Sequence, residues 1–160
     1  MRLNNFIFFQ FIIWSCFFIQ SVAFAESKKF GIGAILGAPT GISAAYNLGH
    51  NRSIDVAAGW SLGDDVNYHI HSTYLMHKPG AFEVDHIDID IYYGIGARIK
   101  ERDTDNKDED FRFGARAPFG VHYMFDDPPV EIFGEVALIL DVLEETDVDF
   151  NLAIGARFWF

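Results

Sequence analysis

The chain has 160 residues, a length typical of one domain, and carries 12 Lys and Arg against 23 Asp and Glu. Its formal net charge is −11 at pH 7. Such an acidic balance argues against nucleic acid or an anionic membrane surface as a binding partner, because both repel negative charge.

The first 25 residues have the three parts of a secretory signal peptide. Met1-Arg2 is a small positive region, residues 6–19 are almost wholly apolar, and Ala23-Phe24-Ala25 is an A-x-A cleavage site. We expect cleavage after Ala25, which leaves residues 26–160 as the mature domain. An uncleaved helix fits less well because the apolar run is short. The one cysteine, Cys16, leaves with this segment, so we expect no disulfide or thiol chemistry in the mature chain.

The mature chain has no run of about 18 to 20 apolar residues that would make a membrane-spanning helix. It divides instead into eight segments of alternating apolar and polar residues, each a predicted strand. These segments are residues 30–37, 41–48, 53–62, 66–77, 86–100, 111–125, 130–141 and 148–160. The links contain turn residues such as Pro79-Gly80 and Asp126-Asp127-Pro128-Pro129. Short links favour an antiparallel meander, because a parallel pair needs a crossover of about a dozen residues.

One face of the predicted strands is apolar, rich in aromatic residues and free of charge. The other face collects glycines and charges of both signs. A soluble barrel would turn the apolar face inward, whereas a membrane barrel would turn it outward. A continuous aromatic-rich surface suits lipid, and mixed charges with small residues suit a narrow polar lumen. We therefore predict an all-β fold, an eight-stranded antiparallel up-and-down transmembrane β-barrel.

Closure of an even number of strands places both mature ends on the periplasmic side. The outer loops are then residues 37–40, 63–65, 101–110 and 143–147, three of them strongly acidic. The aromatic residues of the apolar face form two predicted girdles, as a bilayer-spanning barrel requires. They are Trp60, Tyr68, Phe111, Phe113 and Phe150 at the outer edge, and Phe30, Tyr46, Tyr123, Phe125, Phe158 and Phe160 at the inner edge.

The last strand ends on Phe158-Trp159-Phe160 and puts Leu152, Ile154, Ala156, Phe158 and Phe160 on the apolar face. This pattern resembles the C-terminal strand of bacterial outer-membrane β-barrels, where it is the assembly signal. With the signal peptide and the strand pattern, the mature chain resembles small eight-stranded barrels of the OmpA/OmpX size class. The resemblance implies residence in the outer membrane, contact with its lipid, and recognition of this strand by the barrel-assembly machinery.

Charged residues on the inner face are the first candidate site. Hairpin registers place Glu131 and Glu135 beside Arg157 and set Arg98 near Arg112 and Arg116, with Asp141 at the same end as these last three. We predict a lumen network of ion pairs, because a buried charge is tolerated only when paired. The network comprises Arg98, Arg112, Arg116, Glu131, Glu135, Asp141 and Arg157. The alternative is a ligand or proton path through the barrel.

Histidines and carboxylates on the inner face raise the question of a metal site. His69 and His71 share the inner face of the fourth strand, His122 points inward from the sixth, and Asp88 and Asp90 project from the fifth. Zinc or copper needs three or four converging ligands, and this spacing brings only two histidines near each other. We predict ordinary lumen histidines, with no metal and no cofactor.

Two further features carry weaker hypotheses. His71-Ser72 could suggest a catalytic pair, but adjacent strand residues project to opposite faces, so we predict that the chain is not an enzyme. The run Glu101–Asp110 offers oxygen ligands for calcium or a patch for a surface partner; a solvated loop is the simpler interpretation.

Together these features predict an integral outer-membrane barrel, porin-like in form, with a structural or surface-interaction role and a polar, plugged lumen. The alternatives are a minor transport or small-molecule-binding or ion-binding barrel, and then a lipid-modifying outer-membrane enzyme. No motif indicates a particular ligand or an oligomeric state.

Overall fold

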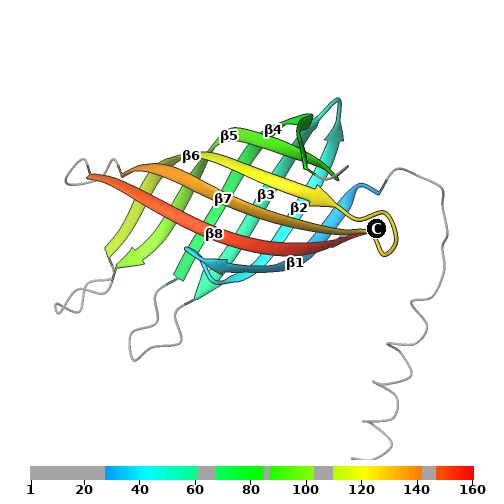
Figure 1. The fold of residues 1–160 in the computed structure, drawn as a ribbon. Coiled ribbons are helices and arrows are strands. Elements are labelled where there is room, and N and C mark those ends of the chain that lie inside the picture. Colours follow the sequence, from blue (N-terminus) through cyan, green and yellow to red (C-terminus); the bar gives the residue numbers. More distant parts are fainter. Residues whose placement is uncertain (1–27, 61–67, 85–86, 103–109, 142–146) are drawn as a thin grey trace, which may run out of the picture.

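A computed structural model describes residues 28–60, 68–84, 87–102, 110–141 and 147–160. These residues form eight strands in one closed barrel, in which every strand pairs antiparallel with its neighbours in sequence and the last pairs with the first (Figure 1). The strands are β1 Phe30–Gly37, β2 Gly41–Gly49, β3 Arg52–Trp60, β4 Tyr68–Val84, β5 Ile87–Arg102, β6 Asp110–Met124, β7 Val130–Asp141 and β8 Asp147–Trp159. The predicted fold class is confirmed. Among the described residues, no helix is long and apolar enough to cross a membrane.

The two faces of the strands differ as the alternation predicts. Along β7, buried and more exposed side chains alternate nearly residue by residue. The buried members include Glu131 and Glu135, whereas Val136 and Leu138 are exposed. This is the reverse of a water-soluble barrel, because charge lies inside and aliphatic side chains lie outside. A small apolar core cluster lies inside as well, formed by Ile35, Ala57, Leu75, Tyr92, Phe133 and Ala153.

Inward glycines make room for large rings in the narrow interior. A Cβ added at Gly120 would lie 2.3 Å from Cζ of Tyr92, and one added at Gly155 would lie 2.3 Å from Cζ of Phe133. Tyr92 and Phe133 are both buried. An eight-stranded barrel encloses just enough space for side chains to fill, so each ring requires a neighbouring position without a side chain.

The beginning of β1 and the end of β8 lie at the same end of the barrel, called here the terminal end. The backbone N–H of Phe160 donates to the carbonyl of Phe30 at 2.9 Å, and the Phe30 N–H donates back at 3.2 Å. The link between β6 and β7 joins this end through a bond of 2.9 Å from the Trp159 N–H to the Pro129 carbonyl. Figure 1 shows the C-terminus beside that link.

The β4–β5 hairpin departs from the sequence prediction. We predicted that the fourth strand ends at residue 77 and that residues 78–85 form the link, because Pro79-Gly80 is a turn signal. This prediction is wrong. β4 continues to Val84, and its register against β5 shifts between Lys78 and Phe82. Gly80, with φ of +60°, lies inside this β-bulge. A bulge accommodates the turn residues as an irregularity within the ladder, and pairing resumes beyond it.

Candidate functional site in the barrel lumen

Three arginines on the inner face, Arg98, Arg116 and Arg157, organise the polar interior. Their relative exposures are 3%, 1% and 5%, so each guanidinium is removed from bulk solvent. They project from β5, β6 and β8 because they occupy inward positions of the period-two alternation. Each one contacts side chains of strands other than its own.

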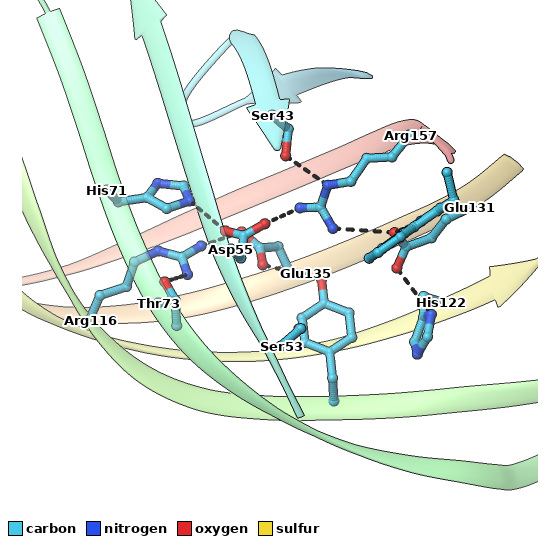
Figure 2. A network of polar contacts seen from close by, with 12 residues as sticks. Ser43, Ser53, Asp55, His71, Thr73, Arg116, His122, Glu131, Glu135 and Arg157 are labelled. Atoms are coloured by element: carbon cyan, nitrogen blue, oxygen red, sulfur yellow. Dashed lines mark hydrogen bonds and ion pairs between the residues drawn. The ribbon is translucent and has the colours of Figure 1, made fainter. Parts of the chain in front are cut away.

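Arg157 binds partners from three strands (Figure 2). Its Nη2 donates to Oδ2 of Asp55 on β3, and its Nε donates to Oγ of Ser43 on β2 at 2.9 Å. Its Nη1 donates to Oε2 of Glu131 on β7 at 3.3 Å. The Arg157 Cζ also lies 4.1 Å from the centre of the Phe133 ring, a cation–π contact. This single side chain therefore links β2, β3, β7 and β8 through the interior.

Each carboxylate partner of Arg157 has a second contact. His71 Nε2 lies 3.3 Å from Asp55 Oδ1. The indole Nε1 of Trp159 donates to Glu131 Oε2 at 2.9 Å. Glu131 Oε1 lies 3.1 Å from Nδ1 of His122, which places Glu131 between Arg157 and His122 in Figure 2. These contacts compensate the loss of water around the buried carboxylates.

Arg116 anchors a second group. Its Nη2 donates to Oε1 of Glu135 on β7, and its Nη1 donates to Oγ1 of Thr73 on β4 at 3.0 Å. The hydroxyl of Tyr92 donates to the other Glu135 oxygen at 3.1 Å. Because Tyr92 lies on β5, this group joins four consecutive strands, β4 to β7.

Arg98 holds the third group, at the end of the barrel opposite the terminal end. Its Nη2 and Nε both donate to Asp141, at 2.8 and 3.3 Å, which is a two-point contact. Its Nη1 donates to Asp149 Oδ2 at 3.1 Å and to Asn151 Oδ1 at 3.3 Å. Arg98 on β5 thus reaches past β6 to β7 and β8.

Not every residue of the predicted network takes part. Arg98, Arg116, Glu131, Glu135, Asp141 and Arg157 all lie in the groups above. Arg112 lies opposite Lys100 in the β5–β6 ladder and, with the described residues, makes no ion pair. We also expected Arg157 to face Glu131 or Glu135. The structure pairs it with Glu131, whereas Glu135 lies opposite Ala153 and binds Arg116.

Several lumen residues were missing from the predicted network. Asp55 is the most important, because it is buried and paired with both Arg157 and His71. Its inward position was visible in the alternation of β3. Its pairing with Arg157 could not be predicted, since Asp55 and Arg157 are 102 residues apart in the sequence. His77, on the inner face of β4, was also overlooked; its contacts are given with the cavity below.

The predicted histidine and serine positions divide between the two faces. His69 and His71 are buried with ring centres 5.7 Å apart, and Ser72 is exposed on the outer face. His71 and Ser72 therefore cannot act on one substrate atom. Asp88, expected on the inner face with Asp90, is exposed near the end of the extended β4–β5 hairpin, where it lies opposite Glu83.

A cavity of about 390 Å³ opens at the terminal end of the lumen. Its wall includes Ser53, His77, Asp90, His122 and Glu131. His77 Nδ1 lies 3.1 Å from His122 Nε2, and Ser53 Oγ lies 2.7 Å from His77 Nε2. The cavity thus brings the imidazoles of His77 and His122 near the carboxylates of Asp90 and Glu131 at a solvent-accessible position.

Other predicted features lie outside the described residues. The signal peptide, residues 1–25, is one of them. Most of the acidic run Glu101–Asp110 is another, since residues 103–109 are not described. The hypotheses of a calcium site or a surface partner at that run stay predictions.

The outward residues of the predicted assembly signal are placed as expected on the outer surface. Leu152, Ile154, Phe158 and Phe160 are all exposed. Ala156 is exposed too and pairs with Ala34 across the β1–β8 seam. The closing strand therefore presents a continuous apolar row.

No protein-family model and no curated protein matches the chain. Solved structures do. The N-terminal β-barrel domain of Pseudomonas aeruginosa OprF superposes with a TM-score of 0.61 at 14% identity, covering 83% of this chain and 98% of that domain. The Yersinia pestis outer membrane protein Ail, determined in a phospholipid bilayer nanodisc, gives a TM-score of 0.43 at 12% identity, covering 82% of this chain and 97% of that one. The chain is similar in fold to the OprF barrel and has the closed eight-stranded architecture of small outer-membrane barrels.

Proposed function

We propose that this chain is an integral outer-membrane protein with a structural role, whose barrel spans the bilayer and whose lumen is closed to solutes by its own ion pairs. The observation that carries the proposal is the opposed character of the two faces. The outer surface is apolar on every strand, whereas Arg98, Arg116 and Arg157 lie inside with their carboxylate partners. Lipid is the surrounding that suits such an exterior.

The outer surface supports membrane insertion in detail. Monomeric soluble proteins rarely expose one continuous apolar patch of more than a few hundred Å². Here large hydrophobic side chains are exposed on all eight strands. Aromatic residues pair toward both ends, with Trp60 opposite Tyr68 at one and Phe30 opposite Tyr46 at the other. Two aromatic bands match the two interfaces of a bilayer.

The reach of Arg157 supports a closed lumen. This residue connects Asp55 on β3 with Glu131 on β7, strands on opposite sides of an eight-stranded ring. The Arg116 and Arg98 groups occupy other levels of the same interior. Among the described residues, the three buried arginines face four buried carboxylates, so the interior is nearly balanced in charge. Paired charges that fill the cross-section leave little room for a hydrated solute.

Orientation and assembly complete the proposal. The signal peptide would deliver the chain to the periplasm, and the terminal end of the barrel would face that compartment. The outward row from Leu152 to Phe160 would be the strand that the barrel-assembly machinery binds. The exposure of this row supports that role, because a binding partner can reach it along its whole length.

Conductance in planar lipid bilayers tests the closed lumen. We expect the wild-type barrel to give no large, stable open channel. The double variant Asp55→Ala/Arg157→Ala removes the link from β3 to β7 and should raise the conductance above that of the wild type. A wild-type barrel with a stable channel of porin size would favour the transport alternative instead.

Membrane residence needs a separate experiment. Outer-membrane fractionation should recover the protein with the membranes, and its gel mobility should change on boiling, as it does for folded barrels that resist detergent. A protein found in the soluble periplasmic fraction, with mobility indifferent to boiling, would contradict the proposal.

A further inference from the structure

The cavity at the terminal end holds a feature that the proposed structural role does not use. His77 on β4 and His122 on β6 direct one ring nitrogen each toward the other, with Nδ1 and Nε2 3.1 Å apart. Asp90, the β5 residue opposite His122 in the ladder, has its Oδ2 3.8 Å from the same His122 Nε2. His122 Nε2 on β6 therefore lies between a ring nitrogen of His77 on β4 and a carboxylate oxygen of Asp90 on β5, in the wall of the cavity.

The second polar atom of His77 and that of Asp90 are each hydrogen-bonded to a neighbour, and that of His122 lies near a carboxylate. Ser53 Oγ lies 2.7 Å from His77 Nε2, and the Gly80 N–H donates to Asp90 Oδ1 at 2.7 Å. Glu131 Oε1 lies 3.1 Å from His122 Nδ1, although the ring is not aligned for a hydrogen bond. Metal-binding histidines are commonly held in this way, with the second nitrogen on a carboxylate or other acceptor and the first left free for the ion. The bulge at Gly80 contributes directly, because it supplies the N–H that orients Asp90.

The distances suit a small divalent ion. Zinc–nitrogen bonds of about 2.0–2.1 Å in a tetrahedral site place two ligand nitrogens about 3.3 Å apart. The His77–His122 separation of 3.1 Å is within a few tenths of an ångström of that edge. As the side chains stand, no group of three or more His, Cys, Asp or Glu residues in the described part of the chain is placed to hold a metal ion. Asp90 Oδ2, now 3.8 Å from His122 Nε2, would have to move closer to share an ion with the two histidines.

Proton positions are compatible with both the empty and the occupied state. The nearby Glu131 carboxylate favours a proton on His122 Nδ1, which leaves Nε2 with a free lone pair. Without metal, His77 Nδ1–H can donate to that lone pair while the Ser53 hydroxyl donates to His77 Nε2. With metal, His77 would carry its proton on Nε2 and donate it to Ser53. A hydroxyl is both donor and acceptor, so Ser53 supports either arrangement.

We propose that His77 and His122, with Asp90 as third ligand, form a binding site for a divalent transition-metal ion that prefers imidazole, Zn²⁺ or Cu²⁺, at the terminal end of the lumen. Imidazole suits both ions, and a carboxylate is a frequent further ligand of zinc. The cavity supplies the route of entry and room for water at the fourth position. This site is separate from the Arg98 and Arg116 groups and meets the Arg157 group at Glu131, which contacts both Arg157 and His122.

The test uses the folded barrel in detergent micelles, purified without a polyhistidine tag. Isothermal titration with Zn²⁺ should show one ion per chain. His77→Ala and His122→Ala should each weaken binding by more than about 10-fold, and Ser53→Ala, which removes only an orienting partner, by about 10- to 100-fold. His69→Ala is the matched control, because His69 is a buried, inward histidine of the same strand outside the cavity. It should leave the affinity unchanged.

Electron paramagnetic resonance of the wild-type protein with one equivalent of Cu²⁺ gives a readout that needs no variant. Two coordinated imidazoles should split the signal through their nitrogen nuclei. Absence of nitrogen coupling, or zinc affinity equal in wild type and in a heat-modifiable, folded His77→Ala variant, would show that the pair is only a histidine–histidine hydrogen bond and would overturn the proposal.

Discussion

Arg157 and Asp55 form an ion pair that joins two residues 102 positions apart, one on the last strand of the barrel and one on the third. Both side chains are buried. Their contact cannot form until the strands between them have closed into a ring, so it belongs to the completed barrel and not to any single hairpin. The pair is therefore a direct probe of barrel closure.

Removal of the Arg157 guanidinium should destabilise the barrel strongly. Arg157→Ala leaves Asp55 without its arginine and deprives Glu131 of one donor, and breaking a buried pair costs about 3–5 kcal/mol. We expect a loss of this size in the free energy of unfolding, measured by denaturant titration in detergent or lipid. Restoring neutrality with Asp55→Asn in the same chain should recover part of it, because the uncompensated charge is then gone.

Arg112→Ala is the matched control for that experiment. Arg112 also lies on the inner face, yet it makes no ion pair with the described residues. Its removal should change the free energy of unfolding by less than about 1 kcal/mol. Equal losses in the Arg157 and Arg112 variants would mean that the effect is a general loss of positive charge and that the specific pairs contribute little.

Substitution by alanine should destabilise the barrel at Gly120 but leave its stability nearly unchanged at Gly134. At Gly120 an added Cβ would lie 2.3 Å from Tyr92 Cζ and 2.7 Å from the Gly134 carbonyl oxygen. At Gly134, on the outer face, the nearest atom would be a methyl carbon of Ile154 at 3.8 Å, an ordinary contact. We expect Gly120→Ala to cost about 1–3 kcal/mol through overpacking and Gly134→Ala to be nearly neutral. Denaturant titration of both variants tests this, and a neutral Gly120→Ala would contradict the packing described for the lumen.

The strands and their two faces could be predicted from the sequence because they depend on local alternation. A period of two fixes which residues share a face, whatever lies across the barrel. Thus the outward row from Leu152 to Phe160 and the inward position of Arg157 followed from the order of residues alone. The eight strands followed from the turn residues between the alternating segments.

Partner choice could not be predicted in the same way. Arg157 binds Asp55, a residue three strands away around the ring, and no hairpin register specifies that contact. The predicted length of the β4–β5 hairpin was wrong for another reason. Pro79-Gly80 has the chemistry of a turn but lies in a β-bulge within the ladder. In the register of this longer hairpin His77 lies opposite Tyr92, and His77, Asp90 and His122 of β6 line one cavity; this register could not be predicted from the turn residues.

Phe160 should matter more for assembly in the cell than for stability of the folded barrel. This residue is 60% exposed, and its ring centre lies 5.3 Å from that of Phe30 and 6.4 Å from that of Phe158. Phe160→Ala keeps both backbone hydrogen bonds to Phe30, so purified protein should refold almost normally. The yield in outer membranes should fall, because the aromatic end of the closing strand is lost as a recognition element.

Phe125→Ala changes another exposed aromatic residue at the terminal end; this variant is the control and should assemble normally. Deletion of Phe160 removes the hydrogen bonds as well and should be worse; normal assembly after that deletion would contradict the proposed signal.

A charge on the outer surface distinguishes a membrane barrel from a water-soluble one. Ile154 is 61% exposed near the middle of β8, and Val148 is exposed near the end of the same strand, on the same face. In water, arginine at either exposed position would change the free energy of unfolding by about 0.5 kcal/mol or less. In a bilayer, arginine costs about 2–4 kcal/mol at the midplane and about 0–1 kcal/mol near the interface. We therefore expect Ile154→Arg to destabilise the barrel in lipid vesicles by at least about 2 kcal/mol and Val148→Arg to be nearly neutral. Because both variants carry the same new charge on one strand, a difference between them reports depth in the bilayer, and two equally mild effects would mean that this apolar surface does not face lipid.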